Sequence, residues 1–529
     1  MISSVLRKCS RRYRLATSLN GLRPETSFSL FRGEPRDTPN QRFNYFHSSV
    51  QHAIDSGERR DNIPQSKFDG KAGVENDIFL NGLQVCDLDD TCRVLQELGV
   101  KAGEHSHHIL QKNLPAIAKH LGTLTSADWK FSHISAIVHS MQSLEELDEG
   151  YSTIMSLMTS KGENLNKSGT ASFEDIAIIM VGLRSNRMTL EESSDFLLCV
   201  TSMVTKSKDT ITAPVLSSMM YGLQSMDSDD ENVRMLLVAL EPKIRSCSVS
   251  LSSKGVLNVM YGLRCMSDDH VEVRSLISAL LPKVSSCTDS LSAQGVGIAL
   301  SSLRRMSSDH AEVRSLLKAV EPTVRSCSST LEPLTLGMAL SGLQAMNSDH
   351  AEVRDMLSAL ELKVRGCSKT FDAFALGNAL SGLRRSRSEH AEVRSLLLAL
   401  EPKIQSCTML LSAQAVGNIL LSLRLMNSEH AEVRSLLSAL EPKIRSCTTS
   451  FTAMGLRNAL SGVRLMSSNH IEVRSLLSAL EPLVKGCVEP LSPEDIAHAT
   501  TCLDSMNSAH AEVLSIRSII QSKATTTSS

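Results

Sequence analysis

A repeat with a period of 40 residues dominates this chain and restricts the folds that are open to it. From residue 251 onward a large apolar residue opens every unit, with no insertion or deletion between units: Leu251, Leu291, Leu331, Phe371, Leu411, Phe451 and Leu491. Self-similarity at a fixed period of this length indicates a repeat array, in which each unit contacts only its neighbours. The 529 residues therefore need no single large core.

Each unit is expected to hold two amphipathic helices, because apolar residues recur at steps of three and four in both of its halves. In the unit that begins at Leu291 they are Val296, Ala299, Leu300, Leu303 and Met306, then Val313, Leu316, Leu317, Val320, Val324 and Cys327. This spacing places each set on one face of a helix. The pattern predicts a buried seam along both helices of every unit.

Polar residues mark where these helices should begin. Ser292, Ser412 and Ser492 stand at the predicted starts of first helices, where a serine oxygen can accept a free backbone N–H. Asp309 and Glu312 have the spacing of a capping box, which predicts the start of a second helix. Proline at 322 predicts a kink inside that helix.

The repeat can be traced backwards with looser spacing. Unit starts at Cys86, Trp129, Ala171 and Ile211 are separated by 43, 42 and 40 residues. We predict an all-α, right-handed α-solenoid of about eleven helix-pair repeats of about 40 residues each. Its repeats are expected to be degenerate over 86–170 and regular over 171–522, followed by a polar tail at 523–529.

The first residues have the composition of a targeting segment. Residues 1–24 carry six basic residues and no acidic one: Arg7, Lys8, Arg11, Arg12, Arg14 and Arg23. Serines and short apolar stretches lie between them, as in organelle transit peptides. We expect a transit peptide and its remainder over 1–50 and a linker over 51–85. Mitochondrion is the first expectation and plastid the alternative; a basic tail that is never removed also remains open.

Several kinds of chemistry are disfavoured. Basic and acidic residues nearly balance, at 55 and 57, so no global field favours nucleic acid. Aromatic residues make up 3%, which argues against stacking platforms. Repeated histidines, such as His310 and His350, should lie about 10 Å apart, too far to share a zinc ion. Cysteines repeated at Cys327 and Cys367 are expected to be free core residues.

Catalytic motifs are absent from the sequence. It contains no phosphate-binding loop, nucleophile elbow, CxxC or HExxH pattern. The acidic run at 227–232 lacks the glycine and the final acid of a calcium loop, having Asn232 and Val238 instead. No apolar run is long enough to span a membrane. We therefore expect no enzyme activity, no cofactor, no metal and no small-molecule substrate.

The first helices differ from one another on the side away from the core. The fourth, eighth, eleventh and fifteenth positions of a unit form a solvent-facing stripe whose residues change from unit to unit. Such a stripe suits modular reading of a linear polymer, in which two or three side chains per repeat contact one base. The candidate RNA-binding residues are Lys254, Asn258, Gln294, Arg305, Asn378, Arg385, Gln414, Asn418, Asn458 and His498.

Arginines recur at the fourteenth position, next to this stripe. They are Arg184, Arg264, Arg304, Arg384, Arg424 and Arg464, and we name them the arginine row. Guanidinium groups in this place could hold phosphates. The alternative is that exposed positions simply drift after duplication, which Leu334 and Met338 on the stripe favour locally.

The first half of the unit resembles a known family. LSAQGVGIALSSLRRM at 291–306 and FDAFALGNALSGLRRS at 371–386 are similar to the first helix of octotricopeptide repeats, including the small residues Gly297, Gly337, Gly377 and Gly417. The resemblance covers 171–529 well and 86–170 weakly. It implies an organellar protein that binds single-stranded RNA in transcript stability, processing, editing or translation, with other RNA-processing proteins as possible partners.

Members of that family often end in a RAP domain, which this sequence does not contain, so the resemblance favours binding over cleavage. We expect non-catalytic, sequence-selective binding of about eight to ten nucleotides, one for each clear unit. The alternative is a protein-interaction scaffold of the armadillo or HEAT type that holds an extended peptide in its groove. Near-zero net charge and the apolar stripe residues support the scaffold.

Overall fold

A computed structural model describes residues 86–526 and Leu83, apart from short gaps at 101–103, 125–127, 143, 145–148, 186–189, 505 and 508. The expected transit peptide at 1–50 and nearly all of the expected linker at 51–85 lie outside the described residues. The described part contains twenty-two α-helices and no strand. They form eleven successive pairs, as the 40-residue period predicts.

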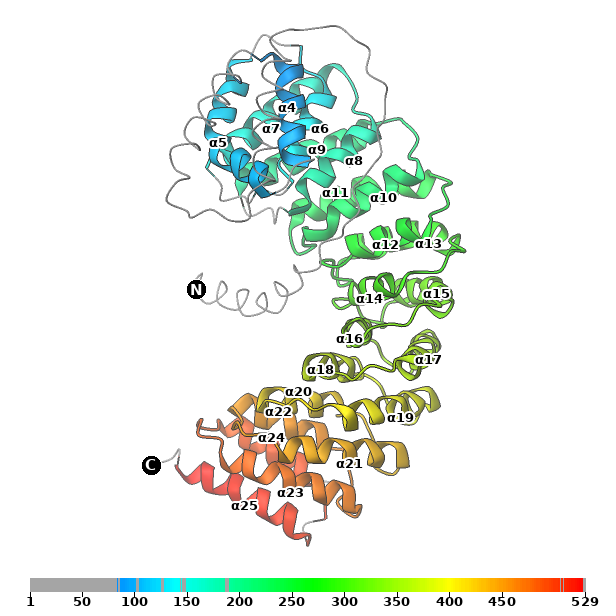
Figure 1. The fold of residues 1–529 in the computed structure, drawn as a ribbon, viewed down its shortest axis with the longest axis vertical. Coiled ribbons are helices and arrows are strands. Elements are labelled where there is room, and N and C mark those ends of the chain that lie inside the picture. The colour runs from blue at the N-terminus through cyan, green and yellow to red at the C-terminus, as the bar shows by residue number, and fades with distance from the viewer. Residues whose placement is uncertain are drawn as a thin grey trace, which may run out of the picture. The chain divides into compact units, whose positions relative to one another are not determined.

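The helices form two layers (Figure 1). First helices pack on the first helices of neighbouring units, and second helices pack on second helices. The first-helix layer consists of α4 (Leu88–Val100), α6 (Phe131–Ser140), α8 (Phe173–Gly182), α10 (Ala213–Gly222), α12 (Ser253–Gly262), α14 (Ala293–Ser301), α16 (Pro333–Ser341), α18 (Ala373–Ser381), α20 (Ala413–Ser422), α22 (Ala453–Val463) and α24 (Pro493–Asp504).

The second-helix layer has the same number of members. It consists of α5 (Glu104–Thr123), α7 (Tyr151–Ser168), α9 (Glu191–Lys206), α11 (Glu231–Ser246), α13 (Val271–Ser285), α15 (Ala311–Arg325), α17 (Ala351–Gly366), α19 (Ala391–Ser406), α21 (Ala431–Arg445), α23 (Ile471–Lys485) and α25 (Ala511–Thr526). Single 3₁₀ turns, η2 (Leu183–Ser185) and η3 (Leu223–Ser225), follow α8 and α10. The predicted all-α helix-pair array is confirmed.

The core lies between the two layers. Every apolar residue predicted for the seam of the unit at Leu291 is buried, and Val296, Leu303 and Leu316 are fully inaccessible to solvent. Each first helix begins two residues after its predicted unit start, so even the degenerate units at Cys86 and Trp129 keep the register of the regular ones. Burial of such side chains contributes about 1.5–3 kcal/mol each.

The predicted caps of first helices are confirmed, and that of the second helix is wrong. Backbone N–H groups donate to the hydroxyls of Ser292, Ser412 and Ser492 over 3.1–3.2 Å. The second helix α15 begins after His310, which makes no side-chain cap bond, and Asp309 lies one residue too early to cap it. The helix continues through the proline at 322 to Arg325.

Glycine at the twelfth position of the unit allows adjacent first helices to approach closely. A Cβ atom at Gly342 or Gly382 would lie 2.0 or 2.2 Å from a carbonyl oxygen of the preceding first helix. Ser302 and Ser422 take this position in two units, and there α14 packs less extensively on α12, and α20 on α18, than the other first helices do on their neighbours. In these regular units, a residue larger than glycine at the twelfth position therefore accompanies looser packing of the first helices.

Lysines near the ends of second helices join neighbouring repeats. The Nζ of Lys443 donates to the backbone oxygens of Gln405 and Cys407 over 3.1 and 2.5 Å. Lys523 donates in the same way to Cys487 O, over 2.5 Å. These lysines satisfy carbonyl groups that the preceding helix end leaves without partners. Lys523 therefore belongs to the last repeat and not to a polar tail, since α25 extends to Thr526.

Candidate functional site

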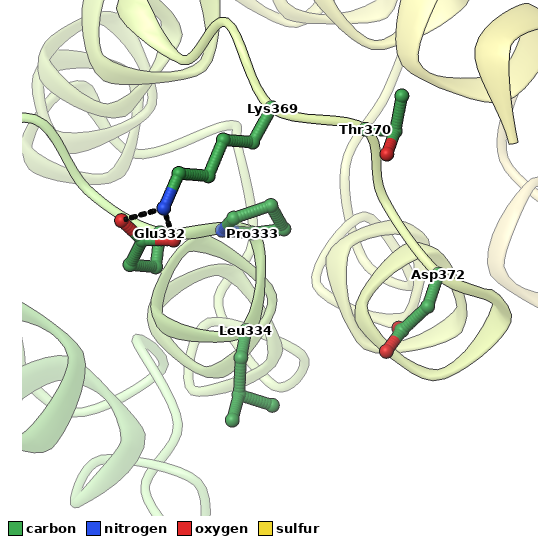
Figure 2. A pocket seen from close by; sticks show the side chains of 6 residues that line it. All are labelled: Glu332, Pro333, Leu334, Lys369, Thr370 and Asp372. Atoms are coloured by element: carbon green, nitrogen blue, oxygen red, sulfur yellow. Dashed lines mark hydrogen bonds and ion pairs between the residues drawn. The ribbon is translucent and has the colours of Figure 1, made fainter.

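The described surface offers no enclosed site for a small molecule or a metal. A shallow depression lies between the starts of α16 and α18, where Lys369 pairs with Glu332 over 2.8 Å (Figure 2). Asp372 accepts the N–H of Ala375 as the N-cap of α18 and is thus engaged as well. No group of three or more potential metal ligands occurs in the described residues. Across the same residues, no helix is both long enough and apolar enough to cross a bilayer.

The predicted stripe residues lie together on one surface, which we name the first-helix face. It comprises the fourth, eighth, eleventh and fourteenth positions of the units, whereas the fifteenth position lies in the turn before the second helix and belongs to the turn ridge described below. Of the candidate residues, Lys254, Gln294, Gln414 and Asn418 are exposed, whereas Asn258, Asn378, Asn458 and His498 are half-buried. The helical spacing alone therefore located this surface.

Side chains on this face contact each other from unit to unit. Asn258 donates its Nδ2 to the hydroxyl of Ser217 over 2.9 Å, and Asn458 donates to Oδ1 of Asn418 over 3.4 Å. His498 Nε2 lies 2.6 Å from the hydroxyl of Ser461. Burial and the nearby arginines lower the pKa of His498. The eighth positions from 258 to 498 carry no acid, and their polar residues are interrupted by Ile298 and Met338.

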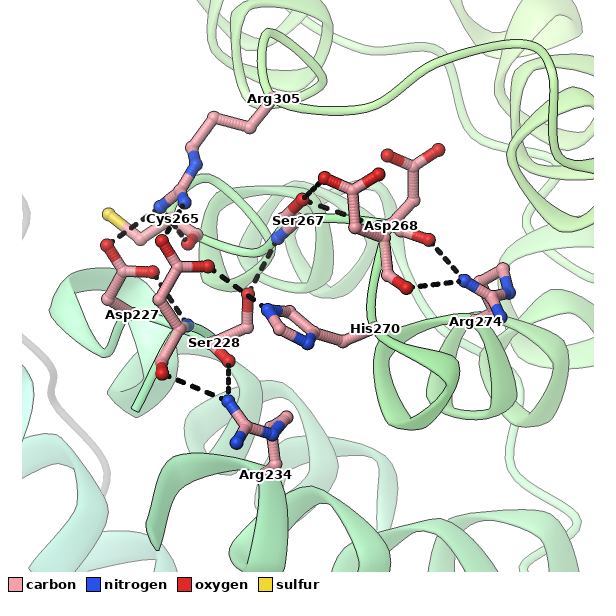
Figure 3. A network of polar contacts seen from close by, with 11 residues as sticks. Asp227, Ser228, Arg234, Cys265, Ser267, Asp268, His270, Arg274 and Arg305 are labelled. Atoms are coloured by element: carbon pink, nitrogen blue, oxygen red, sulfur yellow. Dashed lines mark hydrogen bonds and ion pairs between the residues drawn. The ribbon is translucent and has the colours of Figure 1, made fainter. Parts of the chain in front are cut away.

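Arg305 and Arg385, which were candidates for contacting RNA, are held by acids of this chain. Arg305 reaches back over Cys265 and donates to Asp227 over 2.8 Å and to Asp229 over 3.1 Å (Figure 3). Both pairs join units that are two repeats apart. The small side chain of Cys265, in the unit between, leaves room for the arginine, whose Nη1 also donates to that cysteine's carbonyl over 2.7 Å.

Arg385 forms the same clamp two repeats later. It donates to Asp309 over 2.9 Å and to the carbonyl of Ala345 over 3.1 Å, and the intervening unit again has a small residue in the crossing position. The hydrogen bond from Arg385 lowers the pKa of the Asp309 carboxyl. Both guanidinium groups are therefore already neutralised within the chain, which reduces their value as contacts for a polyanion.

The arginine row contrasts with these clamps. Within the described residues, the side chains of Arg304, Arg384 and Arg424 form no hydrogen bond or ion pair with the chain, and the Nε of Arg424 is buried without a partner. Burial and the guanidinium groups of Arg384 and Arg464 lower the pKa of Arg424. Like charges are thus placed beside one another on the first-helix face without an acid between them.

The first members of the row have aromatic partners that the sequence analysis missed. Tyr221 and Tyr261 stack with ring centres 5.9 Å apart. The guanidinium of Arg184 lies 5.6 Å from the ring of Tyr221, and Arg264 lies 4.9 Å from the ring of Tyr261 and donates to its hydroxyl over 2.6 Å. Both tyrosines occupy the eleventh position of their units, and this recurrence in the sequence could have indicated the stack. This stack is internal, so these two arginines are less available than the later ones.

The turns that join first to second helices form a second polar surface, the turn ridge. Its histidines contact an acid of the preceding unit: Nε2 lies 3.1 Å from the carboxylate in the pairs His270–Asp229 and His390–Asp349. The hydrogen bond from His270 lowers the pKa of Asp229. Sequence reasoning placed these histidines near the second-helix start but did not find their partners.

A buried serine at the eighteenth position connects each turn to the next. Ser228 and Ser308 accept backbone N–H groups of the following unit over 2.8 and 2.7 Å. In the unit between them Asp268 replaces the serine, accepts the N–H of Ser307 over 2.9 Å and lies 4.0 Å from His310. Burial raises the pKa of Asp268. This joint is the exception along an otherwise uniform ridge.

The cysteines described by the structure are free, and those of the repeat lie at the ends of second helices. Cys367 and Cys407 are buried, as expected. Their thiols lie 3.8 Å from the carbonyl oxygen two residues further on. Their role is therefore to fill the helix end.

Comparison with known proteins gives no identity. No protein-family model matches the chain, and no curated protein matches its sequence. Among solved structures, yeast Rmd9p in complex with a 16-nucleotide target RNA aligns with 92% of this chain and 97% of that chain, at 12% identity and a TM-score of 0.28. At those values the likeness assigns no function, so function has to be inferred from this chain's own residues. The resemblance to octotricopeptide repeats stays an expectation.

Proposed function

We propose that this chain binds single-stranded RNA along the first-helix face. The arginine row would contact phosphates, and the polar residues at the fourth and eighth positions would contact base edges. The observation that carries the proposal is the contrast between neighbouring residues: Arg384 has no partner in the described chain, whereas Arg385 is paired with Asp309.

Like charges placed side by side suit a partner with regularly spaced negative charges. Arg384, Arg424 and Arg464 recur once per repeat, and the pKa of Arg424 is lowered by its burial and, in second place, by the neighbouring guanidinium groups. A phosphate between two such guanidinium groups would form charge-assisted hydrogen bonds and relieve their repulsion. Near-zero net charge does not oppose this, because the field that matters is local to the face.

The biological role we propose is non-catalytic. Binding would protect or expose a segment of an organellar transcript and thereby act in its stability, processing, editing or translation. The basic, acid-free first residues support a mitochondrial location, with plastid as the alternative. Import of a tagged full chain, followed by crosslinking and sequencing of the recovered RNA, tests both points. Enrichment of a few organellar transcripts over short footprints is expected, and cytosolic transcripts would contradict the location.

Binding itself is tested with the purified chain and short labelled RNAs of random sequence. Single-stranded RNA should bind more tightly than duplex RNA of the same length, because bases in a duplex cannot reach the eighth-position side chains. Affinity should also fall steeply as salt rises, since each phosphate contact releases counterions. Equal affinity for both RNAs, or none for either, would contradict the proposal.

A second candidate is the protein-interaction scaffold. Leu334, Phe374 and Met454 are exposed at the fourth position of their units, close to the starts of first helices and away from the arginine row. Apolar side chains in such a line could hold an extended peptide. Peptide binding through them would depend weakly on salt, which separates it from RNA binding.

A further inference from the structure

Three consecutive repeats present the same two side chains at the same two places on the first-helix face. An asparagine at the eighth position and an arginine at the fourteenth occur as Asn378 with Arg384, Asn418 with Arg424, and Asn458 with Arg464. The preceding unit has Met338 and Gln344 there instead. The three pairs therefore form a block with one chemical pattern, beginning at α18 and ending after α22.

An earlier unit has the same two residues but uses them internally. Asn258 donates to Ser217 over 2.9 Å, and Arg264 donates to the hydroxyl of Tyr261 over 2.6 Å. In the later block, Asn418 is exposed, and the Asn378 amide has no partner among the described residues. The block thus differs from the earlier unit, because its asparagines bond at most to one another, by the long 3.4 Å contact between Asn458 and Asn418.

The amides in this block also lie in line. Nδ2 of Asn458 is 3.4 Å from Oδ1 of Asn418, so the amides of neighbouring repeats face the same track. First helices of adjacent repeats lie roughly 8–10 Å apart. One RNA strand running along the layer would therefore meet the three amides one after another, with an arginine of the row beside each.

We infer that this block reads three successive identical bases, and that the base is adenine. This rests on the proposed function and names the ligand of the same surface. Identical side chains at the same position of consecutive repeats each carry one donor and one acceptor group, so they select the same base each time. An asparagine amide pairs with adenine through two hydrogen bonds, one donated and one accepted.

The residues around the amides vary without changing this pattern. The eleventh position carries Ser381, Leu421 and Ser461, of which the two serine hydroxyls donate to carbonyls of their own helix. The eleventh position therefore offers no free donor in these units, and the asparagine is the polar side chain that all three share. The contribution of each unit to affinity will differ, whereas the preferred base will not.

The first experiment measures binding of the full chain to labelled single-stranded RNAs that differ only in a central triplet. An RNA with AAA should bind roughly tenfold more tightly than the same RNA with CCC, UUU or GGG. Replacing any one of the three adenines should cost less, roughly twofold, because the losses at separate positions add in free energy. Equal affinity for all triplets, with RNA binding retained, would overturn the inference and leave the proposed function standing. Absence of binding to every RNA would overturn both.

A single substitution tests whether this block is the part of the face that selects the bases. Asn418→Asp keeps the acceptor and removes the donor, so the preference for adenine should vanish at the middle position of the triplet and persist at the outer two. Asn469→Asp is the matched control, because it adds the same charge on the exposed turn ridge, where other units carry an acid. Loss of preference in the control, or its retention in Asn418→Asp, would contradict the assignment, and so would preference for a different homotriplet.

Discussion

Neighbouring arginines differ in their partners between the first-helix face and the turn ridge. On the ridge, Arg305 and Arg385 are bound by acids two repeats away, and histidines bind the acids of the preceding unit. On the face, Arg304 and Arg384, each only one residue earlier, have no partner in the described chain. The charged groups of the ridge connect repeats through ion pairs, whereas the guanidinium groups of Arg304 and Arg384 on the face remain available to a ligand.

The largest effect is expected from removing charge on the face. Changing Arg384, Arg424 and Arg464 together to glutamine should weaken RNA binding by about 1,000-fold, or roughly 4 kcal/mol, because three charge-assisted contacts are lost. The slope of log affinity against log salt should fall by about two. Fluorescence anisotropy at several salt concentrations measures both quantities.

The matched control removes the same charge from the second-helix layer. Arg245, Arg325 and Arg445 each pair with a glutamate four residues earlier on the same helix. Their triple change to glutamine should leave RNA affinity within about twofold, because these groups lie away from the face. A loss as large as that of the face variant would mean that net charge alone governs binding.

The next effect concerns the spacing of the face. Gly382→Ala would place a methyl group 2.2 Å from the carbonyl oxygen of Leu340, so α16 and α18 must separate. We expect a loss of about 3 kcal/mol in the free energy of unfolding, seen as a lower urea midpoint. Gly377→Ala in the same helix meets nothing within 4 Å and should be neutral or slightly stabilising. Equal behaviour of both variants would refute the role given to the twelfth position.

Breaking one ridge clamp should have a smaller effect, on stability and not on binding. Arg385→Ala removes a half-exposed ion pair with Asp309 and a bond to the carbonyl of Ala345. We expect a loss of about 1 kcal/mol in unfolding free energy and RNA affinity within about twofold of the unchanged chain. If affinity instead fell as far as in Arg384→Ala, the distinction between the two surfaces would fail.

The smallest effect is expected at the exceptional joint of the ridge. Burial raises the pKa of Asp268, so the fold favours its protonated form, and stability falls as pH rises through that raised pKa. Asp268→Ser restores the residue of the other units and should add up to about 1 kcal/mol at pH 7. The gain should disappear below about pH 4, the ordinary value of an aspartate. Urea midpoints at both pH values check this, and a gain independent of pH would contradict it.

Sequence periodicity was sufficient to predict the fold and the position of the face. Apolar spacing located the seam at Val296 and Leu316, and serines such as Ser292 located the helix starts, because both depend on residues close in sequence. The handedness of the array stays a prediction. The second-helix cap was wrong because α15 begins one residue later than predicted, after His310, and Asp309 pairs with Arg385, 76 residues away.

Contacts across repeats were what the sequence did not reveal. Arg304 and Arg305 look alike in a linear pattern, and only the positions of Asp227 and Asp229 separate them. Likewise, the family resemblance directed attention to glycines of the seventh position, where a Cβ atom on Gly337 or Gly417 would lie within 3 Å of a neighbouring carbonyl oxygen and one on Gly377 would not, and it did not mark the still closer approach at the twelfth position. The partner of an arginine and the space around a glycine both depend on the atoms of another repeat, whose positions are set by the packing of the helices.

Ultraviolet crosslinking of bound RNA to the purified chain, followed by mass spectrometry of the linked peptides, tests the central claim most directly. Crosslinks are predicted in peptides of the first helices from α14 to α24 and the turns that follow them, including those that carry Arg384, Arg424 and Arg464. Crosslinks concentrated in second helices such as α19 or α21 would contradict the assignment of the ligand to the first-helix face.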